Sequence, residues 1–475
     1  MLPAAIMVAA MTAVTAGAAV AGMPRSAPQV IAGPQWSRCV GKDLEGLECS
    51  TLRVPLDYRH PGGGTIEVAI SRKASRHPEK RRGILLVNPG GPGLAGLTAP
   101  NLIKLSQQIQ DSYDVIGFDP RGVGRSTPLT CDLNPQQQAD TSNPPFPHNA
   151  RDVTAAAAFA KVVARQCATS KTAGLLPSIT TANTARDMDR IREAVGAPKL
   201  SYYGASYGTY LGAVYTTLFP GRSDRIVLDS SLPPEGYTVG ALRAQGSGFE
   251  TRFPDFARWV TVNAKSLGTT PAAVRAKYFE LAERLDKRAE SGVDGTAFRA
   301  TTSGLIRDDS VFPYLADIWQ KLDTNTLPED PVVDHGDNLQ ASYLGVICGD
   351  SRWPRSVATY QANVAIDRVR SPMYGPLAAN IRACAYWPSP STPKVRITGA
   401  GPSNVLIMQN LRDPATPLAG ARRMRAALGH RARMVTVDQG GHGVYTAANR
   451  CGKAAVDTFL TTGQRPPHDT FCPAQ

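Results

Sequence analysis

Short apolar segments recur along the chain, each bounded by Gly, Pro or Asp, and helical patterns separate several of them. The segments are 84–87, 114–118, 200–203, 225–228, 405–408 and 434–437. Runs of this kind are typical of strands in a parallel sheet, since helices bury both of its faces. Patterns at 184–195 and 207–218 fit the connecting helices. We therefore predict a mostly parallel α/β sheet, with 54–58 and 66–70 as an antiparallel hairpin at one edge.

The alternation of predicted strands and helices stops after Leu228 and resumes only near Val405. Between them, residues 232–400 contain helix-like stretches such as 271–290, so we predict a mainly helical lid inserted into the sheet domain. The Pro-rich segment 387–393 is typical of a linker back to the core. The predicted boundaries are a leader peptide at 1–21, the first part of the core at 22–231, the lid at 232–400 and the second part of the core at 401–475.

The first residues carry no charge before Arg25 and are rich in Ala, Val, Thr and Gly. The Ala19-Val20-Ala21 sequence matches the small-x-small pattern that precedes a signal-peptidase cut. We predict a secretory signal at 1–21 and an extracellular mature protein without stable membrane insertion. The alternative is an uncleaved anchor, because about 20 apolar residues can span a bilayer.

The eight cysteines are even in number and none forms the CxxC spacing of zinc or redox sites. Disulfides formed in an oxidising compartment fit this pattern best. Sequential pairing would give Cys39–Cys49, Cys131–Cys167, Cys348–Cys384 and Cys451–Cys472. Other connectivities are possible for eight cysteines, and buried free thiols are the further alternative.

Basic residues outnumber acidic ones, with 52 Lys and Arg against 39 Asp and Glu, for a net charge of +13. They are scattered singly rather than gathered in runs, so we interpret them as a solvated surface and predict no nucleic-acid partner. The glycine-rich segment 117–126 follows a predicted strand but lacks the G-x-G-x-x-G spacing of a dinucleotide site. We predict a structural turn there.

A G-x-S-x-G pattern stands at 204–208, directly after the predicted strand 200–203 and at the start of the predicted helix 207–218. Small residues permit the tight turn that lifts Ser206 above the sheet, and the helix N-terminus aims backbone N–H groups at the reacting centre. This context predicts that Ser206 is a nucleophile; a purely structural serine is the alternative.

A serine hydroxyl needs a base, and a carboxylate must orient that base. His442 follows the predicted strand 434–437 in a Gly-Gly-His-Gly loop, whereas His430 precedes that strand and should face the other end. Asp413 directly follows the predicted strand 405–408, from where it can reach the imidazole. The alternatives are a turn or capping role for Asp413 and, as the acid, Asp438.

The segment Asn88-Pro89-Gly90-Gly91-Pro92-Gly93 immediately follows the strand predicted at 84–87. Such a turn can direct a backbone N–H at a carbonyl oxygen, and the Tyr207 N–H would complete an oxyanion hole. A phosphate-binding loop is the weaker alternative, because the Lys-Ser/Thr of a Walker loop is missing.

With these motifs in this order, the chain resembles the secreted tripeptidyl aminopeptidases of the α/β-hydrolase superfamily, relatives of the proline iminopeptidases with a TAP-like C-terminal region. The resemblance runs from about Trp36 to Cys472. It implies an eight-stranded, mostly parallel sheet flanked by helices, with the lid inserted after strand 6. It also implies a catalytic triad and an oxyanion hole, formed by Ser206, Asp413 and His442 and by Gly91 and Tyr207, respectively. Proline iminopeptidases commonly carry His where this chain has Pro89, so single-proline specificity is not expected.

The family implies release of short peptides, often tripeptides, from a free N-terminus without a metal or cofactor. We expect a monomer whose partners are peptide substrates. An exopeptidase must bind the substrate ammonium, and Asp350 in the predicted lid is our candidate, with a salt bridge or helix cap as its alternative role. Two other functions stay open: a carboxylesterase or lipase using the same triad, and a non-catalytic binding protein of the cell envelope.

Overall fold

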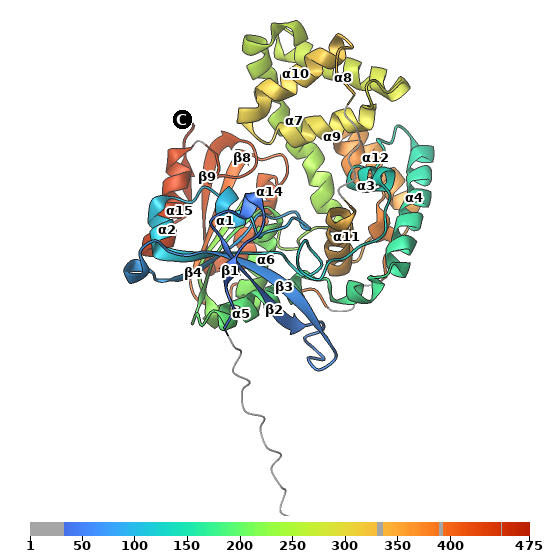
Figure 1. The fold of residues 1–475 in the computed structure, drawn as a ribbon. Helices are drawn as coiled ribbons and strands as arrows, with labels where there is room; N and C mark the ends of the chain where they lie inside the picture. The colour runs from blue at the N-terminus through green and yellow to red at the C-terminus, as the bar shows by residue number, and fades with distance from the viewer. Residues whose placement is uncertain (1–32, 330–335, 389–392, 448) are drawn as a thin grey trace, which may run out of the picture. The chain divides into compact units, whose positions relative to one another are not determined.

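A ten-stranded, mostly parallel sheet runs through the part of the chain that the computed structural model describes, residues 33–329, 336–388, 393–447 and 449–475 (Figure 1). The predicted leader 1–21 and residues 389–392 of the predicted linker lie outside these ranges. The strands are β1 (Ser37–Arg38), β2 (Glu48–Pro55), β3 (Thr65–Lys73), β4 (Gly83–Asn88), β5 (Tyr113–Phe118), β6 (Leu200–Ala205), β7 (Ser223–Asp229), β8 (Val405–Arg412), β9 (Ala432–Gly440) and β10 (Thr470–Cys472).

The strand order is β1-β2-β3-β5-β4-β6-β7-β8-β9-β10. The β2–β3 hairpin is antiparallel, and the strands from β5 through β10 in this order pair in parallel. The eight strands from β2 to β9 confirm the predicted α/β-hydrolase fold, and the short edge strands β1 and β10 are additions that the sequence did not predict. The registers Asn88↔Gly204 and Ala205↔Asp229 align the carboxyl ends of β4, β6 and β7 at one edge.

Helices bury both faces of the sheet. On one face, α2 (Gln107–Ser112) and α15 (Arg450–Thr462) pack together over a cluster that includes Leu85, Tyr203 and Val435. The alternate strand residues Tyr202 and Leu228 lie under α6 (Tyr207–Leu218), which packs beside α5 (Thr181–Ala194). The remaining helices around the sheet are α1 (Ala99–Leu102) and α14 (Leu418–Leu428).

A mainly helical insertion connects β7 to β8, as predicted. Its helices are α7 (Val239–Asn263), α8 (Pro271–Lys287), α9 (Gly295–Leu305), α10 (Phe312–Asp323), α11 (Asn338–Asp350), α12 (Val357–Arg370) and α13 (Gly375–Ala379). Helices α7 to α10 gather around an aromatic core that contains Phe253, Tyr278 and Trp319 (Figure 1). The insertion therefore has a hydrophobic core of its own.

Two further helices, α3 (Pro135–Ser142) and α4 (Ala150–Thr169), precede β6 in the chain but pack against the insertion. Val153 and Ala157 of α4 share a buried cluster with Tyr360 and Val364 of α12 (Figure 1). The sequence predicts this segment in the first part of the core, because it precedes the break in the alternation of strands and helices. In space it extends the insertion.

Four disulfides join the cysteines in the sequential pairing predicted above, and no cysteine is free. Cys131–Cys167 ties α4 to the segment after β5, and Cys348–Cys384 ties α11 to the 3-10 helix η7 (Ala383–Tyr386). Among the described residues, no helix combines the length and apolar character needed to cross a bilayer.

Candidate active site

Ser206 stands at the sharp junction of β6 and α6. Its backbone has φ 57° and ψ −123°, a region that non-glycine residues enter at an energetic cost. The turn is held because the Ser206 N–H donates to the Asp229 carbonyl at 2.9 Å and the Thr209 N–H donates to the Ser206 carbonyl at 2.9 Å. The side chain is half-buried at the carboxyl edge of the sheet.

The loop after β4 lies directly against this junction. A Cβ atom at Gly90 would approach the Ala205 carbonyl oxygen to 2.6 Å and the Tyr207 nitrogen to 3.2 Å, so a side chain would not fit there. Asn88 accepts the Gly90 N–H at 3.0 Å. The Tyr207 N–H is the first of α6, where backbone donors have no partner within the helix. The two predicted oxyanion-hole residues, Gly91 and Tyr207, thus lie on adjoining segments.

His442 and Asp413 are in direct contact. The His442 Nδ1 lies 2.9 Å and 3.1 Å from the two carboxylate oxygens of Asp413. Asp413 also accepts from the N–H groups of Ala415 and Thr416 and from the Thr416 hydroxyl. Burial alone would raise the pKa of Asp413, but His442 and these donors outweigh it and hold that pKa below its ordinary value. Asp413 therefore stays ionised beneath the imidazole.

A second buried carboxylate holds the loop that carries His442. Asp229, at the end of β7, accepts from the Tyr203 hydroxyl at 2.7 Å and from the N–H groups of Val444 and Tyr445 at 2.8 and 2.9 Å. Burial raises the pKa of Asp229, against the opposing effect of these donors. Our sequence reasoning missed this residue, although an acid at the end of an apolar run was a usable signal.

Ser206 and His442 line the same cavity, with a volume of about 370 Å³. Gly91 contributes to its wall. The Tyr237 hydroxyl contacts the Ser206 side chain and donates to the Gly91 carbonyl at 3.4 Å. Tyr237 had no motif around it and was not predicted. An adjoining cavity of about 300 Å³ shares His442 and has Asp308 and Asp309 in its wall.

Asp350, predicted to bind a substrate ammonium, does not line the Ser206 cavity. It ends α11, where its carboxylate accepts from the Thr181 N–H at 2.9 Å and from the Thr181 hydroxyl. That hydroxyl lies 2.6 Å from the Tyr207 phenol oxygen. Burial raises the pKa of Asp350 to about 6. Helix α11 directs the Asp350 carboxylate to Thr181 at the start of α5. This contact fits the alternative structural role, and the ammonium role stays a prediction.

The competing candidates from the sequence lie elsewhere. Asp438 accepts from Arg412 at 2.6 Å, and His430 lies 3.3 Å from the Gly401 carbonyl. Arg121 pairs with Asp187 at 2.6 Å, with both side chains fully buried, as expected for a structural turn at 117–126. Within the described ranges, no three His, Cys, Asp or Glu side chains are grouped so as to hold a metal ion.

A family model described as "TAP-like protein" matches residues 371–472. The chain is 36% identical over 468 residues to a tripeptidyl aminopeptidase of Streptomyces lividans, covering 93% of this chain and 87% of that protein. It is 30% identical to carboxylesterase B of Mycobacterium tuberculosis, covering 95% and 92%. A solved proline iminopeptidase of Mycobacterium smegmatis superposes with a TM-score of 0.43 at 14% identity, covering 86% of this chain and 97% of that one.

Proposed function

Because the chain belongs to the tripeptidyl aminopeptidase family of serine hydrolases, we propose that it is a secreted exopeptidase that releases short peptides, tripeptides first, from free N-termini. The observation that carries this proposal is the contact of Asp413 with His442, which lines the same cavity as Ser206. The four disulfides support an extracellular location.

The proposed chemistry assigns one role to each group. Asp413 holds His442 through Nδ1, which leaves Nε2 to take the Ser206 proton as the hydroxyl oxygen attacks the scissile carbonyl. The Gly91 and Tyr207 N–H groups receive the oxyanion. His442 then protonates the leaving amine, and water, activated by the same imidazole, releases the peptide from Ser206.

The test compares an alanine tripeptide p-nitroanilide with a free N-terminus, the same compound acetylated, and a short-chain p-nitrophenyl ester. We expect turnover of the free-amine peptide only, and a fall of roughly 10⁴-fold or more in kcat for Ser206→Ala. A fluorophosphonate probe should label the wild type and leave Ser206→Ala unlabelled. Equal cleavage of the acetylated and free peptides would contradict the exopeptidase proposal.

An esterase is the second candidate, and one observation favours it. Among the described residues that line the Ser206 cavity there is no Asp or Glu to meet an ammonium group. One relative of 30% identity is named a carboxylesterase. Hydrolysis of the ester without hydrolysis of either peptide would leave the proposed triad intact and select this function.

A further inference from the structure

The Ser206 cavity is lined by two cations. Arg307 and Arg382 both contribute to its wall, and the described residues of that wall include no carboxylate. Four of the eight buried side-chain polar atoms that lack a hydrogen-bond partner in the described chain also belong to this wall. They are Thr141 Oγ1, Arg307 Nε, Gln340 Oε1 and Arg382 Nε. Native proteins leave few buried polar atoms unsatisfied, so this wall offers polar atoms that a polar ligand can engage.

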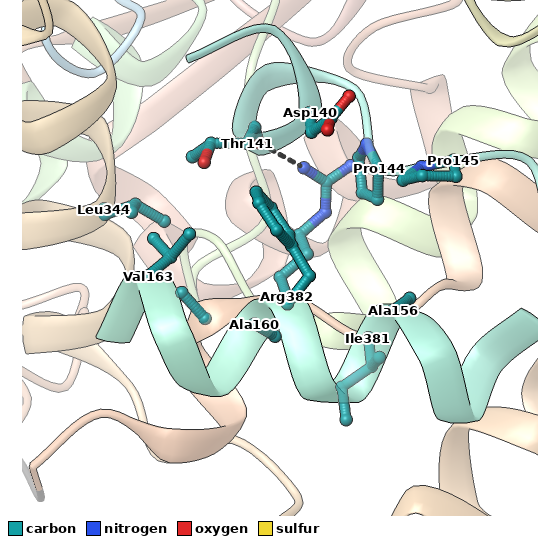
Figure 2. Close-up of a pocket in the computed structure, with 12 residues that line it drawn as sticks. Asp140, Thr141, Pro144, Pro145, Ala156, Ala160, Val163, Leu344, Ile381 and Arg382 are labelled. Atoms are coloured by element: carbon teal, nitrogen blue, oxygen red, sulfur yellow. Dashed lines mark hydrogen bonds between the residues drawn. The ribbon is translucent and has the colours of Figure 1, made fainter. Parts of the chain in front are cut away.

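Arg382 is the more buried of the two cations, with only 9% of its surface exposed. Its Nη1 makes two long hydrogen bonds, 3.5 Å to the Thr141 carbonyl and 3.4 Å to the Ser142 carbonyl, at the end of α3. Figure 2 shows the side chain pointing toward Thr141. Figure 2 draws a second pocket, which shares Thr141 and Arg382 with the Ser206 cavity. Asp140 also lines this second pocket, but its carboxylate accepts from Gln136 and not from Arg382. No described carboxylate forms an ion pair with Arg382, so a nearly buried charge is left without a counter-ion.

Arg307 is the second cation in the wall of the cavity. Its carbonyl accepts the His442 N–H at 2.8 Å, which places its backbone beside the proposed base. In the described chain its Nε has no hydrogen-bond partner, and no described carboxylate forms an ion pair with it. The two acids that follow it are engaged elsewhere: Asp308 accepts from the Ser310 N–H, and Asp309 pairs with Arg252.

Both guanidinium groups act on one hydroxyl. Burial raises the pKa of Tyr343, and the positive charges of Arg382 and Arg307 both oppose that rise. Tyr343 lies on α11 and lines the same cavity. The two cations and Tyr343 therefore belong to one cavity and interact electrostatically within it.

Other buried arginines in the described chain have their acceptors. Arg121, Arg252 and Arg299 each form an ion pair with an aspartate. Arg431 lacks an acid but donates to the Thr216 and Ala400 carbonyls at 2.8 Å and to further oxygens. Arg382 and Arg307 differ from these arginines because neither has a described carboxylate partner and both line a ligand cavity. Two cations without counter-ions in such a cavity point to an anionic ligand.

We propose that Arg307 and Arg382 form a subsite that binds a carboxylate of the substrate, so that the enzyme prefers acidic peptides. This rests on the proposed function, since it names the substrate class of the same site. A guanidinium presents a planar fork of donors that matches a carboxylate. The carboxylate has two sources in a peptide: an Asp or Glu side chain, or a free C-terminus.

The experiment separates these sources with two matched pairs. One pair is a tripeptide p-nitroanilide containing a glutamate and the same compound with glutamine. The other is a neutral tetrapeptide with a free C-terminus and its C-terminal amide. We expect kcat/KM to favour the acidic member of at least one pair by about 10–100-fold, since a hydrogen bond to a charged group contributes about 1.5–3 kcal/mol. A ratio near one in both pairs would overturn the subsite.

Variants locate the preference. In Arg382→Gln and Arg307→Gln the acidic-to-neutral ratio should fall toward one, mainly through KM, and Arg382→Lys should retain part of it. Arg368→Gln, an exposed position on α12, is the matched control and should keep the wild-type ratio. A preference that survives both glutamine substitutions would contradict the assignment. If Arg382→Gln does not fold, Arg307→Gln and Arg382→Lys still decide it.

A binding readout keeps the subsite distinguishable from the peptidase proposal. N-acetylglutamate should slow fluorophosphonate labelling of Ser206 at concentrations where N-acetylglutamine does not, and Arg307→Gln should abolish the difference. Protection with no peptide cleavage would support the subsite and contradict the exopeptidase. Peptide cleavage without a preference for acidic substrates, and without a difference in protection between the two N-acetyl amino acids, would support the exopeptidase and contradict the subsite.

Discussion

The carboxyl edge of the sheet and the helical insertion both line the Ser206 cavity, and their charged side chains differ in how many partners they have. On the sheet side, Asp413 and Asp229 are saturated with donors. On the insertion side, Arg307 and Arg382 lack counter-charges in the described chain. The groups assigned to chemistry are thus held in place before substrate arrives, whereas those assigned to selection await a partner.

The largest effect should come from the sheet side. Asp413→Asn preserves the shape of the site but removes the charge that supports the imidazolium, so we expect kcat to fall by roughly 10⁴-fold. Steady-state kinetics on the tripeptide anilide would measure this. Asp438→Asn is the matched control, because Asp438 pairs with Arg412 and not with His442. A comparable loss in the control would mean that the acid has been misassigned.

A substitution in the core of the insertion should lower the free energy of unfolding and leave the reactivity of Ser206 unchanged. Trp319 is fully buried in its aromatic core, so Trp319→Ala should cost about 3–5 kcal/mol in the free energy of unfolding. Denaturant unfolding followed by circular dichroism would measure the loss. Below the unfolding transition, fluorophosphonate should still label Ser206. Loss of labelling in the folded variant would show that the Ser206 turn depends on the insertion core.

Asp229 tests whether the His442 loop is positioned from the sheet. Asp229→Asn replaces one of the two accepting oxygens by an NH2 donor, so part of the set of donors loses its acceptor. The loop should shift and kcat should fall by about 10²-fold. KM should change little, because Asp229 does not line the cavity. A rise in KM with unchanged kcat would contradict the positioning role.

The smallest effect concerns Asp350, an insertion residue that supports the sheet side. Its pKa is raised from 3.8 to about 6, so its contribution to stability is fully present below pH 3.8 and is lost as the pH rises toward and through 6. Asp350→Asn should therefore gain about 1–3 kcal/mol relative to the wild type between pH 4 and pH 7. Unfolding free energies across this range would measure it. A flat difference, or a changed KM for free-amine peptides, would contradict the structural role.

The sheet was readable from the sequence because buried parallel strands leave continuous apolar runs. The segments 84–87 and 405–408 fall inside β4 and β8. Ser206, Asp413 and His442 are predicted for the same reason, since each follows such a run. Asp229 satisfied that signal too, but several acids follow strands, and only the fold shows which one meets the His442 loop.

The residues that the insertion contributes to the Ser206 cavity could not be predicted from apolar runs. Thr141 and Arg382 are hydrogen-bonded across 241 positions, and no periodic pattern joins them. Helix α4 precedes β6 in the chain, so sequence order assigned it to the core although its buried face meets α12. Arg307 and Tyr237 stand in no motif, and their positions follow from helix packing alone.

The disulfide between Cys348 and Cys384 joins the two segments that bring Tyr343 and Arg382 to the cavity. Neither the Ser206 turn nor the Asp413–His442 contact depends on a covalent link of this kind. We therefore expect the proposed catalytic residues and the Arg382 side of the cavity to reach their final structure in separate steps. A chain that folds while its cysteines are still reduced would form the Ser206 turn and the Asp413–His442 contact without fixing the positions of Tyr343 and Arg382. Its selectivity among peptides would appear only after the cysteines are oxidised.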